Sequence, residues 1–202
     1  MTSVMLSIRP EWCEKIIDGK KTVEVRKSRP KIEPPFKCYI YCSLPKYDHE
    51  DFFVVNAGTE NAFSFYGGGK VIGEFVCNRV EDYSKWEYDI PALYRHINLF
   101  ACIDFPELYK YLPNGGGYGW HISDLKIYDR PREITEFLTV DKKAVKTCPY
   151  RERTGQAEIV TKHNGWIKGG YLCKIEEITW CYPCHTKNLE KAPQSWCYVK
   201  EV

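Results

Sequence analysis

Three charged side chains stand close together in the sequence: Lys21, Glu24 and Arg26, within the pattern Gly19-x-Lys21-x-x-Glu24-x-Arg26. Lysine and arginine can bind phosphate, and a carboxylate can accept a hydrogen bond from the exocyclic amino group of a base such as cytosine. A lysine that gives up its proton in a dry cleft can instead act as a catalytic base. The alternative interpretation is an ordinary ion pair between Glu24 and Arg26 on a solvated strand face, worth less than about 1 kcal/mol.

A short helix followed by a strand is predicted to position these side chains. Pro10 suits the first turn of a helix over residues 10–18, and Gly19 is placed to end that helix in a left-handed conformation. From Lys21 onward the pattern changes to the alternation of a strand. The alternation puts Lys21, Val23 and Val25 on one side and Thr22, Glu24 and Arg26 on the other. Charged groups gathered beside a helix end in this way predict a polar cleft.

The rest of the chain alternates between apolar runs and turns. Strands are predicted at residues 3–8, 36–42, 70–77 and 120–128, and helices at residues 90–100 and 105–112. The second of these helices is expected to begin with Asp104 as its cap and Pro106 in its first turn. These segments therefore combine several strands with a few short helices.

The Gly19-x-Lys21-x-x-Glu24-x-Arg26 motif, with residues 7–12 before it, resembles the opening of the ASCH (activating signal cointegrator homology) family, in the PUA-like superfamily. Two later segments, residues 120–128 and residues 192–199, resemble the same family. This resemblance implies an α+β fold, a PUA-like β-barrel with short helices flanking it. It also implies two parts: residues 1–139 with 192–202 as the ASCH barrel domain, and residues 140–191 as a Cys-rich insertion before the last strand.

The resemblance further implies a basic cleft and a link to RNA, or to nucleic acid more broadly. The expected ligand-binding residues are Lys21, Glu24, Arg26, Tyr118, Trp120, His121 and Ser123. In this interpretation the two cations contact phosphate or a base edge, and Glu24 accepts from an amino group. Tyr118 or Trp120 offers an aromatic face for a splayed base, while at least one of the two rings is expected in the core. The first hypothesis is therefore a nucleic-acid or nucleotide binding module, with RNA favoured.

The second hypothesis is an enzyme, because the resemblance extends to amidohydrolases that act on acylated cytidine and to ribonucleases. Lys21 would then be the catalytic residue, together with Glu24. The amidohydrolase pattern has threonine where this chain has Glu24, and that carboxylate favours an ammonium that binds over an amine that abstracts a proton. Catalysis would need a further carboxylate, for which Glu74, Glu81 and Asp82 are equal candidates. Binding is therefore favoured over catalysis.

The expected insertion carries the motif Cys181-x-x-Cys184-His185, which matches three kinds of site. Haem attachment requires an exported chain, and a thioredoxin-like redox pair requires a βαβ setting. The third possibility is a structural Zn²⁺ site completed by Cys148 and Cys173, which would stabilise a segment too small to hold a core of its own. Plain thiols without a metal are the alternative. An adaptor protein that docks through an apolar patch on this insertion is the third functional hypothesis.

The composition is that of a globular chain, with 202 residues of which 44% are hydrophobic and 28% are charged. No run of about 18 apolar residues could cross a membrane, and no signal peptide is visible, so we expect a cytoplasmic protein. Ten cysteines are then expected as thiols or metal ligands, with Cys38, Cys77 and Cys102 in the core. The net charge is only +2, but residues 9–46 hold ten lysines and arginines against five acidic residues, a local excess of +5. Such a patch favours contacts to phosphate.

Overall fold

The computed structural model describes residues 3–44, 52–55, 63–86, 90–113, 116–140 and 186–201. The chain divides into two units, one made of Met1–Ile134 with Lys191–Cys197 and the other of Thr135–Glu190 with Tyr198–Val202. Most of the expected Cys-rich insertion, including Cys148, Cys173, Cys181 and Cys184, lies outside the described residues. The zinc site and the docking patch predicted there stay predictions.

The first unit begins with strand β1 (Ser3–Ile8), helix α1 (Pro10–Ile17) and strand β2 (Val23–Arg26). The predicted helix is confirmed: Pro10 lies in its first turn, and Cys13 and Ile16 are buried on its inner face. Gly19 has a φ of 72°, the left-handed conformation expected at the end of this helix. This left-handed residue ends the helix and lets the chain turn toward β2.

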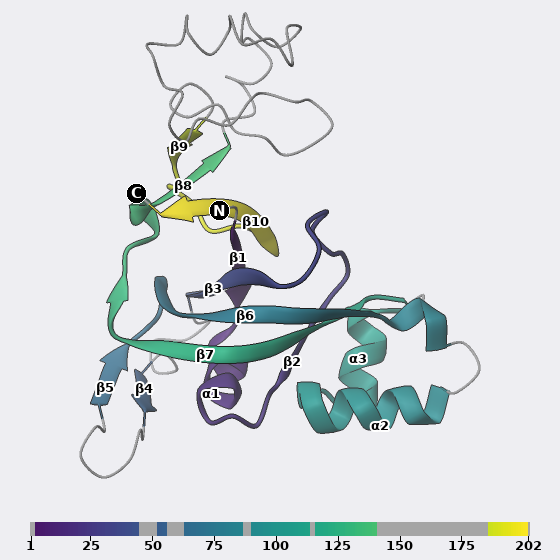
Figure 1. Cartoon of the computed structure of the whole chain (residues 1–202). Helices are drawn as coiled ribbons and strands as arrows, with labels where there is room; N and C mark the ends of the chain where they lie inside the picture. Colours follow the sequence, from purple (N-terminus) through teal and green to yellow (C-terminus); the bar gives the residue numbers. More distant parts are fainter. Residues whose placement is uncertain are drawn as a thin grey trace, which may run out of the picture. The chain divides into compact units, whose positions relative to one another are not determined.

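Five strands of this unit form the main part of a sheet in the order β2-β7-β6-β3-β1 (Figure 1). Here β3 is Phe36–Cys42, β6 is Lys70–Asp82 and β7 is Tyr118–Arg132. Strands β1 and β3 are parallel, whereas β2, β7, β6 and β3 pair antiparallel in turn. The other strands, toward the C-terminus, are β10 (Trp196–Glu201), β8 (Phe137–Val140) and β9 (Thr186–Asn188).

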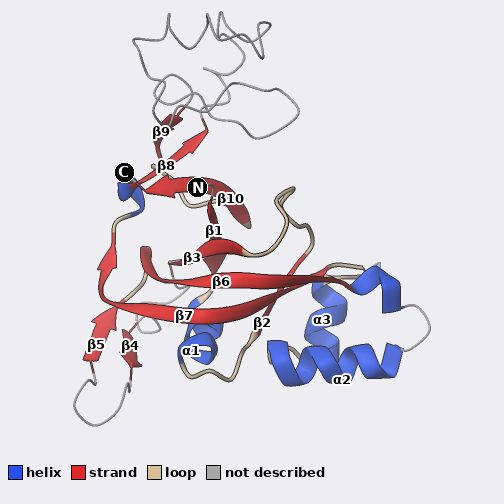
Figure 2. Cartoon of the chain, viewed as in Figure 1, coloured by secondary structure: helices blue, strands red, loops and turns tan. Residues whose placement is uncertain are grey.

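The expected closed barrel is wrong, because the five strands of the first unit form an open sheet, with β2 at one end of their order and β1 at the other. The chain between β6 and β7 folds into helices α2 (Ile90–Ala101) and α3 (Phe105–Tyr111), preceded by a 3₁₀ turn at Tyr83–Trp86 (Figure 2). Side chains from these segments form one apolar cluster with β2: Val23, Val25, Tyr83, Ile97, Ala101, Ile103 and Leu108. Just before β2, the Thr22 N–H donates to the Phe100 carbonyl at the end of α2. Side chains of α2 and α3 therefore pack against those of β2.

Both predicted helices between β6 and β7 are confirmed. The Asp104 side chain accepts a hydrogen bond from the Glu107 N–H at 2.9 Å, and proline follows in the first turn. The expected core cysteines divide, since Cys38 and Cys77 are buried whereas Cys102 is only half-buried. Burial raises the pKa of the Cys77 thiol to about 12, so this side chain stays a neutral core group.

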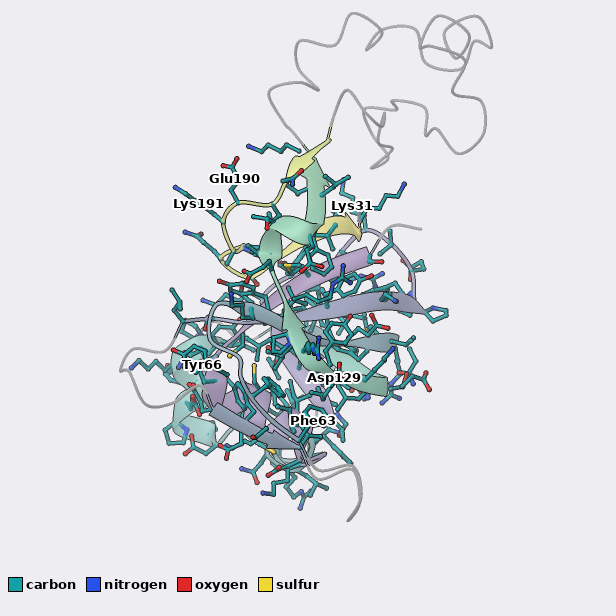
Figure 3. The ribbon with its side chains drawn as sticks, turned by 90° about the vertical axis from the view of Figure 1, so that its left-hand side faces the viewer. Lys31, Phe63, Tyr66, Asp129, Glu190 and Lys191 are labelled. Carbon is teal, nitrogen blue, oxygen red and sulfur yellow. The ribbon has the colours of Figure 1, made fainter. Side chains whose placement is uncertain are left out.

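Shorter elements complete the described part of the chain. Strands β4 (Phe52–Val55) and β5 (Phe63–Tyr66) form a separate antiparallel pair. In the second unit β8 pairs with β9 and β10, beside a 3₁₀ turn at Ile134–Glu136. Tyr66 at the end of β5 and Asp129 on β7, both exposed, are labelled in Figure 3. Of the helices that the structure describes, none combines the length and apolar character needed to cross a membrane.

The half-buried carboxylate of Glu74 on β6 predicts a loss of stability at acid pH. Glu74 accepts hydrogen bonds from the Tyr128 hydroxyl at 2.6 Å and pairs with the Lys37 ammonium at 3.1 Å. Burial alone would raise the pKa of Glu74, but these two hydrogen bonds and the Lys37 charge outweigh it and lower the pKa. A carboxylate with a lowered folded-state pKa stabilises the protein above its unfolded pKa, and the contribution is lost as the pH falls through the folded value.

We therefore expect the unfolding free energy of the wild type to fall as the pH drops through and below the ordinary pKa of a glutamate, with a shallower fall in Glu74→Gln. Tyr128→Phe should move the loss to higher pH, because it removes one hydrogen bond that favours the charged carboxylate. Urea unfolding across this pH series measures both effects. Parallel stability curves for the wild type and Glu74→Gln would contradict the assignment.

Candidate functional site

The three charged residues of the motif form a buried ion-pair triad at β2. Lys21, Glu24 and Arg26 are only 2%, 7% and 5% exposed. The Lys21 Nζ lies 3.3 Å from Glu24 Oε2, and the Arg26 Nη2 lies 3.0 Å from Glu24 Oε1. One carboxylate therefore bridges two cations. The interpretation as a solvated surface ion pair is wrong, because none of the three side chains is on the surface.

The predicted strand alternation fails at Lys21 for a local reason. Strand β2 begins only at Val23, and the Lys21 N–H still donates to the Lys15 carbonyl of helix α1 at 2.9 Å. The chain is still turning at Lys21, so the strand alternation does not fix the side of the strand on which the Lys21 side chain lies. Its Nζ instead reaches Glu24 and donates to the Ala101 carbonyl at 2.8 Å.

Arg26 ties the triad to two distant parts of the first unit. Its Nη2 donates to the Ser7 carbonyl at 2.7 Å, and its Nη1 lies 3.2 Å from the carbonyl and 3.3 Å from the hydroxyl of Ser195. The remaining donor, Nε, is buried and has no hydrogen-bond partner among the described residues. Since buried charges are retained where they are paired and hydrogen-bonded, this network holds the guanidinium in one position.

A cleft of about 610 Å³ opens over the triad. The residues that line it come from β1, α1, β2, α3 and the segments just before α1, β2 and α3: Ser7, Ile8, Arg9, Trp12, Lys21, Glu24, Val25, Arg26, Ile103, Asp104, Pro106, Glu107, Lys110 and Tyr111. Trp12 and Tyr111 are the half-buried aromatic rings of this lining. Burial raises the pKa of Tyr111, so its hydroxyl stays neutral. The cleft thus joins a charged floor to two aromatic side chains.

The charges of the lining nearly balance. The charged lining residues are Arg9, Lys21, Arg26 and Lys110 against Glu24, Asp104 and Glu107. Four cations against three carboxylates leave an excess of one, so the larger excess counted over residues 9–46 is not concentrated here. Arg9 and Lys110 are exposed, whereas the two cations of the triad are buried.

The structure places the expected stacking residues elsewhere. Trp120 is 0% exposed and packs edge-on against Phe36 at 5.7 Å between ring centroids, with Trp196 6.0 Å away. Trp120 is the partner of Glu24 in the β2–β7 ladder, and Tyr118 is the partner of Arg26. The expectation that Trp120 offers a ring face to a base is wrong, because the ring is part of the core. Trp12, which was not among the expected site residues, lines the cleft instead.

His121 and Ser123 also lie away from the cleft. His121 follows Trp120 by one residue and pairs with Val23, so it faces the other side of the strand pair. It lines a second cavity of about 230 Å³. The Ser123 hydroxyl donates to the Val76 carbonyl at 3.0 Å. The structure therefore brings Lys21, Glu24 and Arg26 together, but not with the other four expected site residues.

The carboxylates that catalysis would require are also outside the cleft. Glu74 is held by Tyr128 and Lys37, as described above. Glu81 lies 3.1 Å from His96 Nε2 and 3.2 Å from His121 Nε2. The Asp82 carboxylate accepts hydrogen bonds from Ser84. None of the three belongs to the lining of the cleft over the triad.

These features define a mixed α+β domain with a large open sheet and a cleft over a buried ion-pair triad. Residues 6–105 match the family model of the ASCH domain, and this part of the chain belongs to the ASCH family.

Among solved structures, a crystal structure of ASCH from Zymomonas mobilis is 18% identical, with a TM-score of 0.45 over 65% of this chain and 73% of that one. A mutant of the same Zymomonas mobilis protein is 17% identical, also with a TM-score of 0.45, over 65% of this chain and 76% of that one. No curated protein matches the sequence.

Proposed function

We propose that this protein binds RNA and that the cleft over the triad receives a single nucleotide of it. The observation that carries the proposal is the burial of Glu24 between two cations at the floor of an aromatic-lined cleft. A carboxylate with about four acceptor positions keeps acceptor capacity after two ion pairs. Such an acceptor, fixed at the bottom of a cleft, suits the exocyclic amino group of a base.

The remaining lining residues supply the other contacts that a nucleotide needs. The volume of about 610 Å³ falls in the range of about 300–1,000 Å³ that small-molecule sites occupy. Trp12 and Tyr111 offer aromatic rings for stacking, the usual way in which proteins hold an unstacked base. Arg9 and Lys110 are the exposed cations of the lining and suit the flanking phosphates. The nearly balanced charge favours one nucleotide in the cleft over a long polyanion track.

The family supports the same proposal, because ASCH domains are generally thought to bind RNA. In this scheme Lys21 is a positioning residue. Its side chain is 1% exposed, and its Nζ already donates to Ala101 and pairs with Glu24. A general base needs a lone pair within reach of the proton it removes, whereas the Lys21 Nζ is buried and already engaged with Glu24 and the Ala101 carbonyl. Binding is therefore preferred over an amidohydrolase or a ribonuclease with Lys21 as its catalytic residue.

The exposed cations give a test that leaves the buried triad intact. We expect Lys110→Ala and Arg9→Ala each to weaken binding of single-stranded RNA and to reduce the slope of log affinity against log salt by about 0.7, the value for one phosphate contact on a single strand. Fluorescence anisotropy with a labelled oligonucleotide at several salt concentrations measures both quantities.

Lys187→Ala is the matched control, because Lys187 is an exposed lysine that does not line the cleft. This control should keep the affinity and the salt slope of the wild type. Equal affinities for all four proteins, or no binding at low salt, would refute the proposed site.

A further inference from the structure

Outside the cleft, three metal-ligating side chains converge in the first unit. Glu81, His96 and His121 each offer one ligand atom, and these atoms all lie within 4.8 Å of one another. The Glu81 Oε2 lies 3.1 Å from His96 Nε2 and 3.2 Å from His121 Nε2. All three side chains are between 17% and 18% exposed. The cluster is therefore only partly accessible to water.

Each of the three residues comes from a different element. Glu81 lies near the end of β6, His121 lies on β7, and His96 lies in helix α2. The ladder between β6 and β7 sets Glu81 opposite Gly119, two residues from His121. The His96 ring packs beside Tyr83 and Phe100, with centroid distances of 6.5 and 4.9 Å. Because strands and a packed helix hold them, the side chains are positioned before any ligand arrives.

The hydrogen-bonding requirements of these side chains cannot all be met within the protein. The Arg79 Nη2 lies 2.9 Å from His121 Nε2 and 3.9 Å from Glu81 Oε2. A guanidinium only donates, so His121 Nε2 would have to accept from Arg79 while donating its proton to Glu81. One ring nitrogen cannot do both. The Arg79 guanidinium, a cation, thus already lies close to both the His121 ring nitrogen and the Glu81 carboxylate oxygen.

We infer that Glu81, His96 and His121 form a binding site for a divalent transition metal ion, Zn²⁺ by the nature of its ligands, with Arg79 occupying the metal's place in its absence. Zn²⁺ binds imidazole nitrogen and carboxylate oxygen at about 2.0–2.1 Å, and in a tetrahedral arrangement such ligands lie about 3.3 Å apart. The two separations of 3.1 and 3.2 Å from Glu81 fit that spacing. The Arg79 side chain is 61% exposed, so it can leave without opening the core.

The surroundings support a metal that keeps an open coordination position. His96 and His121 line the cavity of about 230 Å³, together with Arg79, Thr22 and Asn78. Three protein ligands and one open position are the arrangement that zinc uses where it binds water or another ligand.

Cobalt absorption can distinguish this site from the cysteines. The full-length chain, freed of metal with a chelator, is titrated with Co²⁺, which gives visible d–d bands when it is bound tetrahedrally. Thiolate ligands add a sulfur-to-metal charge-transfer band in the near ultraviolet, and a site of two imidazoles and one carboxylate does not. We expect one equivalent of Co²⁺ to bind without that band and to be displaced by Zn²⁺.

Variants identify the ligands. Glu81→Gln and His121→Gln should each weaken this Co²⁺ binding by at least tenfold, since even partners outside the first coordination shell contribute about 10–100-fold. Glu33→Gln, which removes an exposed carboxylate paired with Arg29, is the matched control and should bind as the wild type does. Arg79→Ala should bind Co²⁺ more tightly, because the competing cation is gone. That gain keeps the test decisive even if a ligand variant does not fold.

Three outcomes would overturn the proposal. The first is Co²⁺ binding that is unchanged in both ligand variants. The second is a set of visible d–d bands that grow only in proportion to the sulfur-to-metal charge-transfer band. The third is an Arg79→Ala protein that shows no metal binding at all. The experiment does not involve RNA, so its failure would leave the proposed function of the cleft untouched.

Discussion

Glu24→Gln is expected to lower the free energy of unfolding by about 3–5 kcal/mol, the cost of leaving a buried charge without its partner. Glutamine keeps the shape of the side chain, but it leaves Lys21 and Arg26 as two buried cations with no carboxylate between them. Arg26 keeps its hydrogen bonds to Ser7 and Ser195, and Lys21 keeps the Ala101 carbonyl and the Trp12 ring, whose centroid lies 5.0 Å from its Nζ. Urea denaturation followed by circular dichroism measures the loss.

Two further proteins show that burial causes this effect. Glu33→Gln also removes a carboxylate from an ion pair with an arginine, but Glu33 is 79% exposed, and the change should cost less than about 1 kcal/mol. Lys21→Met combined with Glu24→Gln removes one of the two buried cations that have lost their carboxylate, and it should recover part of the stability. A Glu24→Gln protein as stable as Glu33→Gln would contradict the buried triad.

Trp120→Ala is expected to cost a further large amount, about 3–5 kcal/mol of unfolding free energy, because it opens a cavity in the core. The indole is fully buried and packs between Phe36 and Trp196. Trp12→Ala removes the same side chain from a half-buried position that lines the cleft. We expect a smaller loss of stability from Trp12→Ala, but a loss of RNA affinity of about 1–3 kcal/mol, the contribution of one stacked base.

Measuring thermal unfolding and RNA anisotropy on both proteins separates the two tryptophans. Trp120→Phe is the control for Trp120→Ala, because it keeps an aromatic ring and should recover much of the stability. If Trp120→Ala were as stable as the wild type and lost RNA binding, the ring would be a ligand contact and not part of the core. That result would restore the role that the sequence suggested for Trp120.

The local elements around the motif could be predicted from the sequence, because short-range chemistry determines them. Pro10 and Gly19 mark the two ends of α1, and Asp104 caps α3 through a contact three residues away. The path of the chain at Lys21 could not be predicted in this way. The strand pattern alone does not reveal that β2 begins two residues later, at Val23.

The site was predictable only where its residues are close in sequence. Lys21, Glu24 and Arg26 lie within six residues of one another and do form one cluster. The groups that hold this cluster, Ala101 and Ser195, are brought there by tertiary folding and leave no mark on the motif. The open sheet was missed for the same reason, since the packing of α2 and α3 along β2 depends on contacts between distant segments.

The aromatic and histidine assignments show what spacing alone cannot decide. Trp12 and Trp120 both lie beside family-like segments, and only the packing against Phe36 shows which of them is in the core. His96 has no motif around it and would be found only by knowing that α2 lies next to the β6–β7 pair. Glu81 had been one of three equivalent acidic candidates, and its two histidine neighbours now distinguish it.

The hydrogen bonds from Arg26 to Ser195 also bear on how the protein matures during its synthesis. These two residues are 169 positions apart in the chain. At about 5–20 residues per second, the ribosome takes roughly 10–30 s to make the residues between them. During this interval Arg26 has been made, but two of its acceptors have not. The floor of the cleft is therefore completed late, and nascent chains that stop before residue 195 should emerge with an unfinished site.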